Sequence, residues 1–198
     1  NLSTTGARAL TTTVLNNLSA TQLGSLSTTQ VGALSTSVMS TLLTTTLKNF
    51  STAQFQAIGS SALNQLNTTQ VQSLSTAQVV AITSTNFAAL SSSNLQALTS
   101  SQVQVLSSND LNALSTTQIQ LIKTDQLNAL TTQQLANLSS TNMGALTSTQ
   151  FSKLSNSQVA SLNTTTVNAL STDQLQGLNT SQLVYLGTDA VAAMSTTQ

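Results

Sequence analysis

An eight-residue repeat runs through the whole chain without an insertion or a deletion. If Leu2 is taken as position 0, an apolar residue recurs at every eighth position as far as Met194. A second apolar residue recurs five positions later, from Ala7 to Val191. Position 1 is nearly always Ser, Thr or Asn, position 4 is mostly Gln, and position 7 is most often Ala, which gives the consensus L-S-T-x-Q-(L/V)-x-A. A register held over 198 residues indicates one structural element per repeat, stacked on its neighbours.

Three other structures fit this spacing less well. Low-complexity Ser/Thr/Gln-rich chains are often disordered, but disorder does not require two apolar columns to stay in register. A continuous α-helix would turn its apolar face by about 80° in every repeat, so that face could not meet one partner surface. A β-solenoid is the alternative fold, although side chains alternate across a strand and spacings of five and three would need a bend or bulge in every repeat.

The polar positions of the repeat predict a helix start. A Ser or Thr followed three residues later by Gln is a capping box, in which the hydroxyl and the Gln side chain each accept a backbone N–H hydrogen bond. The clearest pairs are Ser27 with Gln30, Ser115 with Gln118, and Thr147 with Gln150. The residues before the cap and four after it can form a hydrophobic staple. These are the two apolar columns, represented by Leu26 with Val31, Leu74 with Val79, Leu114 with Ile119, and Leu146 with Phe151.

Both signatures fall in one register, so the sequence predicts an all-α solenoid of short capped helices, one for each eight-residue repeat. Helices this short are unstable alone because nucleation is costly, so the two columns must form a shared core. We expect residues 1–198 to form a single continuous array of about 24 octapeptides, with no linker and no evident capping repeat. Four repeats have a poor cap residue and should be weaker, those beginning at Leu43, Gly59, Lys123 and Gly187.

Composition excludes several function classes. The chain has no His and no Cys, which removes the usual ligands of zinc, haem and iron–sulfur clusters and the Ser-His-Asp triad. Four basic and four acidic residues are too few for a basic nucleic-acid-binding surface, and no apolar stretch is long enough to span a bilayer. We therefore expect no catalytic, cofactor-binding or metal-binding residue, no cofactor, no nucleic-acid partner and no membrane span, and we expect that the protein is not an enzyme.

The repeat resembles the octapeptide arrays of very large bacterial secreted or cell-surface proteins, often described as adhesin-like. The resemblance is one of period and composition and covers the whole chain. It implies an extracellular or cell-surface location and a structural or adhesive role, with no catalytic residue to carry over.

Two functions follow as hypotheses. The first is a non-enzymatic structural protein that forms an extended rod or filament, such as a fibre subunit, stalk or surface matrix. Its main partner would be itself, because few charges oppose end-to-end or lateral association. The alternative is an ice- or polysaccharide-binding solenoid, with a surface glycan as its partner, that presents a regular Thr/Ser array including Thr28, Thr36, Thr44 and Thr52.

Overall fold

The structure, a computed structural model, describes residues 3–198. In this range every octapeptide forms one α-helix of four to six residues and no strand is present, so the all-α solenoid is confirmed and the β-solenoid alternative is wrong. The 24 helices are α1 Thr4–Arg8, α2 Thr12–Asn17, α3 Ala20–Gly24, α4 Thr28–Gly32, α5 Thr36–Met39, α6 Thr44–Lys48, α7 Thr52–Gln56, α8 Ser60–Leu63, α9 Thr68–Ser73, α10 Thr76–Val80, α11 Ser84–Ala88, α12 Ser92–Ala97, α13 Ser100–Gln104, α14 Ser108–Ala113, α15 Thr116–Gln120, α16 Thr124–Ala129, α17 Thr132–Ala136, α18 Ser140–Ala145, α19 Ser148–Phe151, α20 Asn156–Ala160, α21 Thr164–Asn168, α22 Thr172–Gln176, α23 Thr180–Leu183 and α24 Thr188–Ala192.

The backbone between helices uses only conformations that ordinary residues adopt. Each N-cap is extended, as at Ser75 with φ −68° and ψ 154°, and the residue before it is extended as well, as at Leu74 with φ −61° and ψ 138°. No residue in the described range has a positive φ. The repeat therefore needs no left-handed glycine to end a helix, which is consistent with a chain of seven Gly and no Pro.

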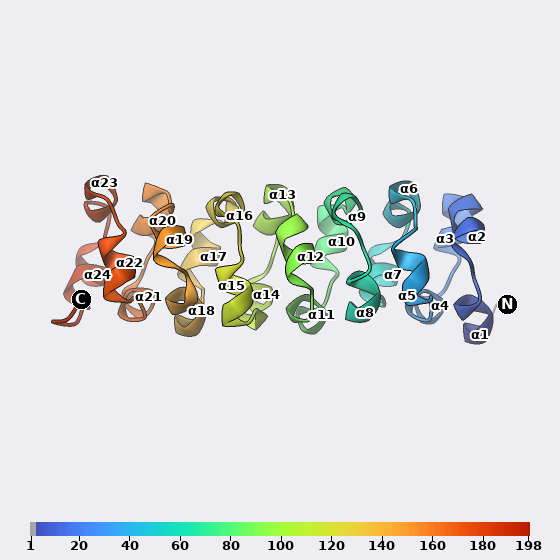
Figure 1. Cartoon of the computed structure of the whole chain (residues 1–198), viewed down its shortest axis with the longest axis horizontal. Helices are drawn as coiled ribbons and strands as arrows, with labels where there is room; N and C mark the ends of the chain where they lie inside the picture. The colour runs from blue at the N-terminus through green and yellow to red at the C-terminus, as the bar shows by residue number, and fades with distance from the viewer. Residues whose placement is uncertain (1–2) are drawn as a thin grey trace. The chain divides into compact units, whose positions relative to one another are not determined.

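The chain divides into two compact units, Asn1–Val105 with α1 to α13 and Leu106–Gln198 with α14 to α24. Within the first unit, α1, α4, α7, α10 and α13 pack in one row, and α6, α9 and α12 in another. Within the second, α15, α18, α21 and α24 form a row, and α17, α20 and α23 another. The colour sequence in Figure 1 follows this winding inside each unit. Because each helix packs on the helix three repeats away, one turn contains three octapeptides.

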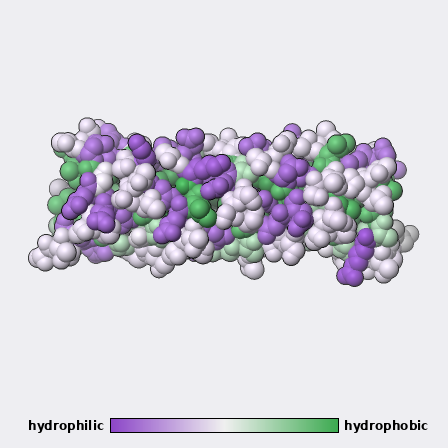
Figure 2. Space-filling view, in the orientation of Figure 1, coloured by the Kyte–Doolittle hydropathy of each residue, from purple (hydrophilic) through white to green (hydrophobic). Residues whose placement is uncertain are grey.

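The two apolar columns form the interior of each unit. Seven of the predicted core residues are buried: Val31, Leu74, Val79, Leu114, Ile119, Leu146 and Phe151. Leu26, also predicted to be in the core, is only half-buried, although Leu15 and Leu23 in the same turn are fully buried. On the face displayed in Figure 2, pale and hydrophilic residues cover most of the surface, with hydrophobic residues in small separate patches.

Candidate functional site

The predicted capping boxes lie at helix starts. At α4, the Ser27 hydroxyl accepts from the Gln30 N–H at 3.2 Å, and the Ser27 N–H donates to Gln30 Oε1 at 2.7 Å. Ser115 and Gln118 make the same pair of bonds at α15, as do Thr147 and Gln150 at α19. In these bonds the Gln side chain uses only its oxygen, so its amide nitrogen can donate to a different part of the molecule.

In the assembled units the amide nitrogen of the position 4 Gln reaches the preceding turn. Gln78 Oε1 accepts from the Ser75 N–H at 3.1 Å, while its Nε2 donates to the carbonyl of Leu47 at 2.8 Å and to that of Phe50 at 3.0 Å. Both carbonyls belong to the end of α6 and the linker after it, where helix carbonyls lose their own helical partners. One side chain thus satisfies a helix start in its own turn and a helix end in the turn before.

This contact, which we call the glutamine bridge, recurs with constant spacing. Its Nε2 donates to the carbonyls 31 and 28 residues earlier, at distances of 2.6 to 3.1 Å. Both bonds are made in the first unit by Gln54, Gln70, Gln78 and Gln102, and in the second by Gln150, Gln158, Gln174 and Gln198. The bridge therefore links every turn it occupies to the turn before it.

The bridge accounts for the polar content of the core. Every buried polar or charged side chain in the described range lies at position 4. Where Asn replaces Gln, the shorter side chain reaches one carbonyl only, as from Asn94 to Leu63 at 2.7 Å and from Asn142 to Leu111 at 2.9 Å. No buried side-chain nitrogen or oxygen in residues 3–198 lacks a hydrogen-bond partner. A polar column through the core is tolerated because it is fully paired.

The sequence interpretation missed this second role of the Gln, although one signal for it exists. A capping box accepts Glu as readily as Gln, because only an acceptor oxygen is needed. The chain has no Glu at all, and Asp110 is the only carboxylate at position 4. A strong preference for an amide at that position indicates that the side chain must also donate, which a carboxylate cannot do.

The four repeats predicted to be weak lack a side-chain cap. At the starts of α6, α8 and α24, the N-cap residues Leu43, Gly59 and Gly187 make no capping hydrogen bond with their own side chains. The Lys123 side chain carries no acceptor for a capping bond, but the Lys123 N–H donates to Gln126 Oε1 at 3.1 Å. The helices form nevertheless, because packing on neighbouring turns stabilises them more than a single cap does.

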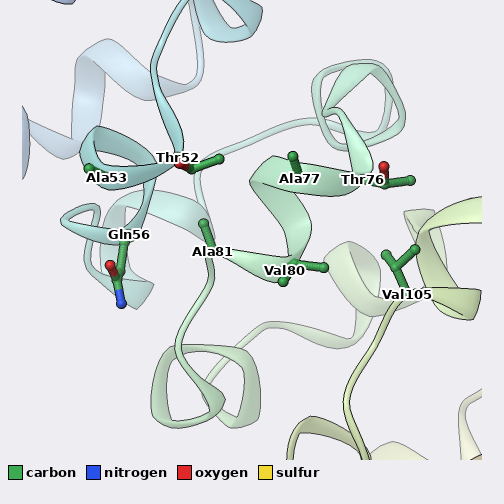
Figure 3. Close-up of a pocket in the computed structure, with 8 residues that line it drawn as sticks. All are labelled: Thr52, Ala53, Gln56, Thr76, Ala77, Val80, Ala81 and Val105. Atoms are coloured by element: carbon green, nitrogen blue, oxygen red, sulfur yellow. The ribbon is translucent and has the colours of Figure 1, made fainter.

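A shallow groove lies on the outer side of the α7 and α10 row in the first unit. Figure 3 shows its lining, which comes mainly from α7 and α10 with Val105 at one edge. The lining residues are Thr52, Ala53, Gln56, Thr76, Ala77, Val80, Ala81 and Val105, none of which is charged. Val80 and Val105 are exposed, at 57% and 37%. The groove offers small apolar and hydroxyl groups and no acid, base or nucleophile with an activating partner.

The winding also rearranges the Thr array. With three octapeptides per turn, Thr28 on α4 and Thr52 on α7 share a row, whereas Thr36 on α5 and Thr44 on α6 belong to the other two rows. The row that contains Thr28 and Thr52 continues with Thr76 on α10 and then Ser100 on α13. All four of these hydroxyl residues are exposed. A Thr face therefore repeats once in every turn, not once in every octapeptide.

The described residues contain neither a metal-binding cluster nor a membrane-spanning helix. No group of three or more His, Cys, Asp or Glu side chains within residues 3–198 could hold a metal ion. Each helix in that range is too short and too polar to cross a membrane.

Short capped helices wound three to a turn, with a paired polar column inside, define this chain as an α-solenoid repeat protein. The model of the ALTTAQ repeat family matches residues 58–92, 104–140, 119–156, 152–188 and 167–198, which is more than half of the chain. The protein therefore belongs to the ALTTAQ repeat family. In the family name, the first A corresponds to position 7 of the octapeptide and L-T-T-A-Q to positions 0 to 4. The name therefore includes the core Leu, the helix cap and the bridging Gln. No curated protein matches the chain.

Proposed function

We propose that this protein is a non-enzymatic structural element, an extended extracellular rod that associates with copies of itself in a fibre, stalk or surface matrix. The glutamine bridge is the observation that supports the proposal most directly. It repeats the same three hydrogen bonds on successive turns, at Gln54, Gln78 and Gln102, so each of these turns is held in the same way as the last. A design of this kind supports length rather than a single localised site.

The surface supports self-association. The chain has four basic and four acidic residues and a net charge of zero, so little electrostatic repulsion opposes contact between copies. The row of α4, α7 and α10 presents Thr29, Ala53 and Ala77 at position 3, all exposed and uncharged. Rods with such a repeated face could align side by side over many turns.

Sedimentation velocity and negative-stain microscopy over a range of protein concentrations test the proposal. Elongated particles that grow or bundle with concentration are expected. The triple variant Thr29→Lys, Ala53→Lys, Ala77→Lys should reduce bundling and leave the far-ultraviolet circular dichroism spectrum unchanged, whereas Ser at the same three positions should have no effect. Uniform compact monomers at every concentration would contradict the proposed role. Antibody labelling of intact source cells tests the extracellular location, and labelling only after lysis would contradict it.

A second candidate is binding to ice or to an uncharged polysaccharide through the Thr row. The observation in its favour is that Thr28, Thr52 and Thr76 are exposed and equivalent on successive turns of one row. The test compares the unmodified chain with Thr28→Ser, Thr52→Ser, Thr76→Ser, which keeps the hydroxyls and removes the methyl groups. Loss of thermal hysteresis in this variant would support an ice-binding face. An unmodified chain with no thermal hysteresis and no binding to insoluble glucans would exclude this candidate.

A further inference from the structure

Three Asn residues at position 6 make a contact between turns that differs from the glutamine bridge. Asn64 Oδ1 accepts from the Ser91 N–H at 2.8 Å, while Asn64 Nδ2 donates to the Ala89 carbonyl at 2.9 Å. Asn112 makes the equivalent bonds to Ser139 and Asn137, at 2.7 and 2.9 Å. Asn16, Asn64 and Asn112 each accept from the N-cap N–H that lies 27 residues later. We call this contact the asparagine clamp.

Each clamp occurs where the glutamine bridge is missing. The repeats whose N-cap N–H is clamped have Thr46, Asn94 and Asn142 at position 4 in place of Gln. In the first of these, the Thr46 hydroxyl and the Leu43 N–H both donate to Asn16 Oδ1, at 2.8 and 3.0 Å. The three short side chains are not the acceptors of these N–H groups, which are bonded to the clamps instead. The clamp therefore supplies, from an earlier turn, the acceptor that Gln supplies within its own repeat.

The glutamine bridge alone does not distinguish one register from another. Its acceptors are always the carbonyls of positions 5 and 0, and every repeat offers both. If the stacking of Gln102 slipped by one octapeptide, its Nε2 would meet carbonyls equivalent to those of Val71 and Leu74. Uniform patterns specify register weakly for this reason, as flat and repetitive strands do in sheets.

The asparagine clamp does distinguish registers. A slip of one octapeptide would place Asn64 opposite Thr99, whose N–H already donates to Gln102 Oε1 at 2.8 Å. The same slip would leave the Ser91 N–H without its acceptor, at a cost comparable to a lost hydrogen bond. A single polar residue fixes the register of a coiled coil in a comparable way.

We propose that the asparagine clamps fix the winding of the solenoid at three octapeptides per turn. The clamp residues Asn16, Asn64 and Asn112 follow one another at intervals of six octapeptides, and so do their counterparts Thr46, Asn94 and Asn142. The sequence thus carries a second period of two full turns over the octapeptide period. The shorter period builds the helices, and the longer one specifies which turns stack.

A double-mutant cycle tests whether the clamp and the bridge are alternatives. Asn64→Ala should expose the Ser91 amide, so that its hydrogen exchange becomes about tenfold faster, and should lower the urea midpoint. In the Asn94→Gln background the new Gln can accept from Ser91, so Asn64→Ala should leave exchange at Ser91 unchanged and lower the urea midpoint by less, because only the bond from Asn64 Nδ2 to the Ala89 carbonyl is then lost. Equal effects in both backgrounds would mean that Asn64 only packs, and would overturn the clamp as a substitute for the bridge.

A distance measurement tests the register itself, within the first unit alone. The unclamped variant combines Asn16→Ala, Asn64→Ala, Thr46→Gln and Asn94→Gln, which leaves a more uniform set of bridges. Because Gln is the consensus at position 4, this variant should keep its helical circular dichroism; a loss of helix would contradict the proposal. Unlike the double-mutant cycle, this distance measurement reports how the turns are arranged and not how stable they are.

Spin labels at Thr29→Cys and Ala77→Cys report on α4 and α10, which lie two turns apart in one row. The chain has no native Cys, so both labels are specific. With the clamps present, pulsed electron–electron double resonance should give one narrow distribution of distances between the two labels. The unclamped variant should give a broader distribution or a second distance. The same single narrow distance in both proteins would overturn the proposal that the clamps set the register.

Discussion

Removal of one glutamine bridge should destabilise the solenoid far more than removal of an ordinary surface Gln. Gln78 is 2% exposed, accepts from the Ser75 N–H and donates to the carbonyls of Leu47 and Phe50. Gln78→Ala leaves all three backbone groups without this partner. At about 1 kcal/mol for each net hydrogen bond, the expected loss is about 3 kcal/mol, and more if water does not reach the carbonyls.

Urea denaturation followed by circular dichroism at the helical band measures this loss. Two matched variants separate the contributions. Gln72→Ala removes an exposed Gln of α9 and should cost less than about 0.5 kcal/mol. Gln22→Ala removes an exposed Gln of α3 that makes a capping box, and should cost about 1 kcal/mol. If Gln78→Ala is no more destabilising than Gln22→Ala, the bonds to the preceding turn add nothing and the reasoning fails.

Three further predictions concern the bridge, the contact between successive helices of one row, and the core. In Gln78→Glu the introduced carboxyl should have a pKa above that of a free Glu, because it would be buried facing two carbonyl oxygens. The variant should then be most stable at low pH and lose stability as pH rises through that raised pKa. A urea midpoint that stays flat from acid to neutral pH would refute this. Gly32→Ala should lower the free energy of unfolding measured by urea denaturation by about 1–3 kcal/mol, because the added Cβ would lie 2.8 Å from the Ala57 carbonyl oxygen. Gly24→Ala is the matched control: it lies at the same repeat position, its Cβ would have no atom within 4 Å, and it should be neutral or stabilising. Phe55→Ala should cost about 3–5 kcal/mol, because its fully buried ring fills the interior of the first unit, and a loss below about 1 kcal/mol would mean that the site collapses to fill the cavity.

Local structure was predictable because its causes lie within one repeat. The Ser27 hydroxyl and the Gln30 side chain belong to the same helix start, so a capping box forms wherever that pair begins a helix. The odd spacing of the apolar columns excluded a regular strand by the same local reasoning. The register of the columns also indicated most of the buried residues; among the exceptions, Leu26 is half-buried and Leu183 and Val191 are exposed.

The candidate site was predictable only in part. The acceptor half of the glutamine bridge followed from sequence, because Gln150 Oε1 meets the N–H of Thr147 in the same repeat. The donor half joins Gln150 to Ile119 and Ile122, 31 and 28 residues earlier, and no local rule gives that distance. The asparagine clamp was missed for the same reason.

The sequence by itself determined that each octapeptide is a short helix with one apolar face, in most repeats with a side-chain cap, because capping and periodicity act within a single repeat. The tertiary structure alone decided that three helices make a turn. It thereby placed Thr28 beside Thr52 rather than Thr36, and gave the position 4 amide its carbonyl partners. The number of helices per turn depends on how side chains pack between helices three repeats apart, and the octapeptide pattern alone contains no record of that separation.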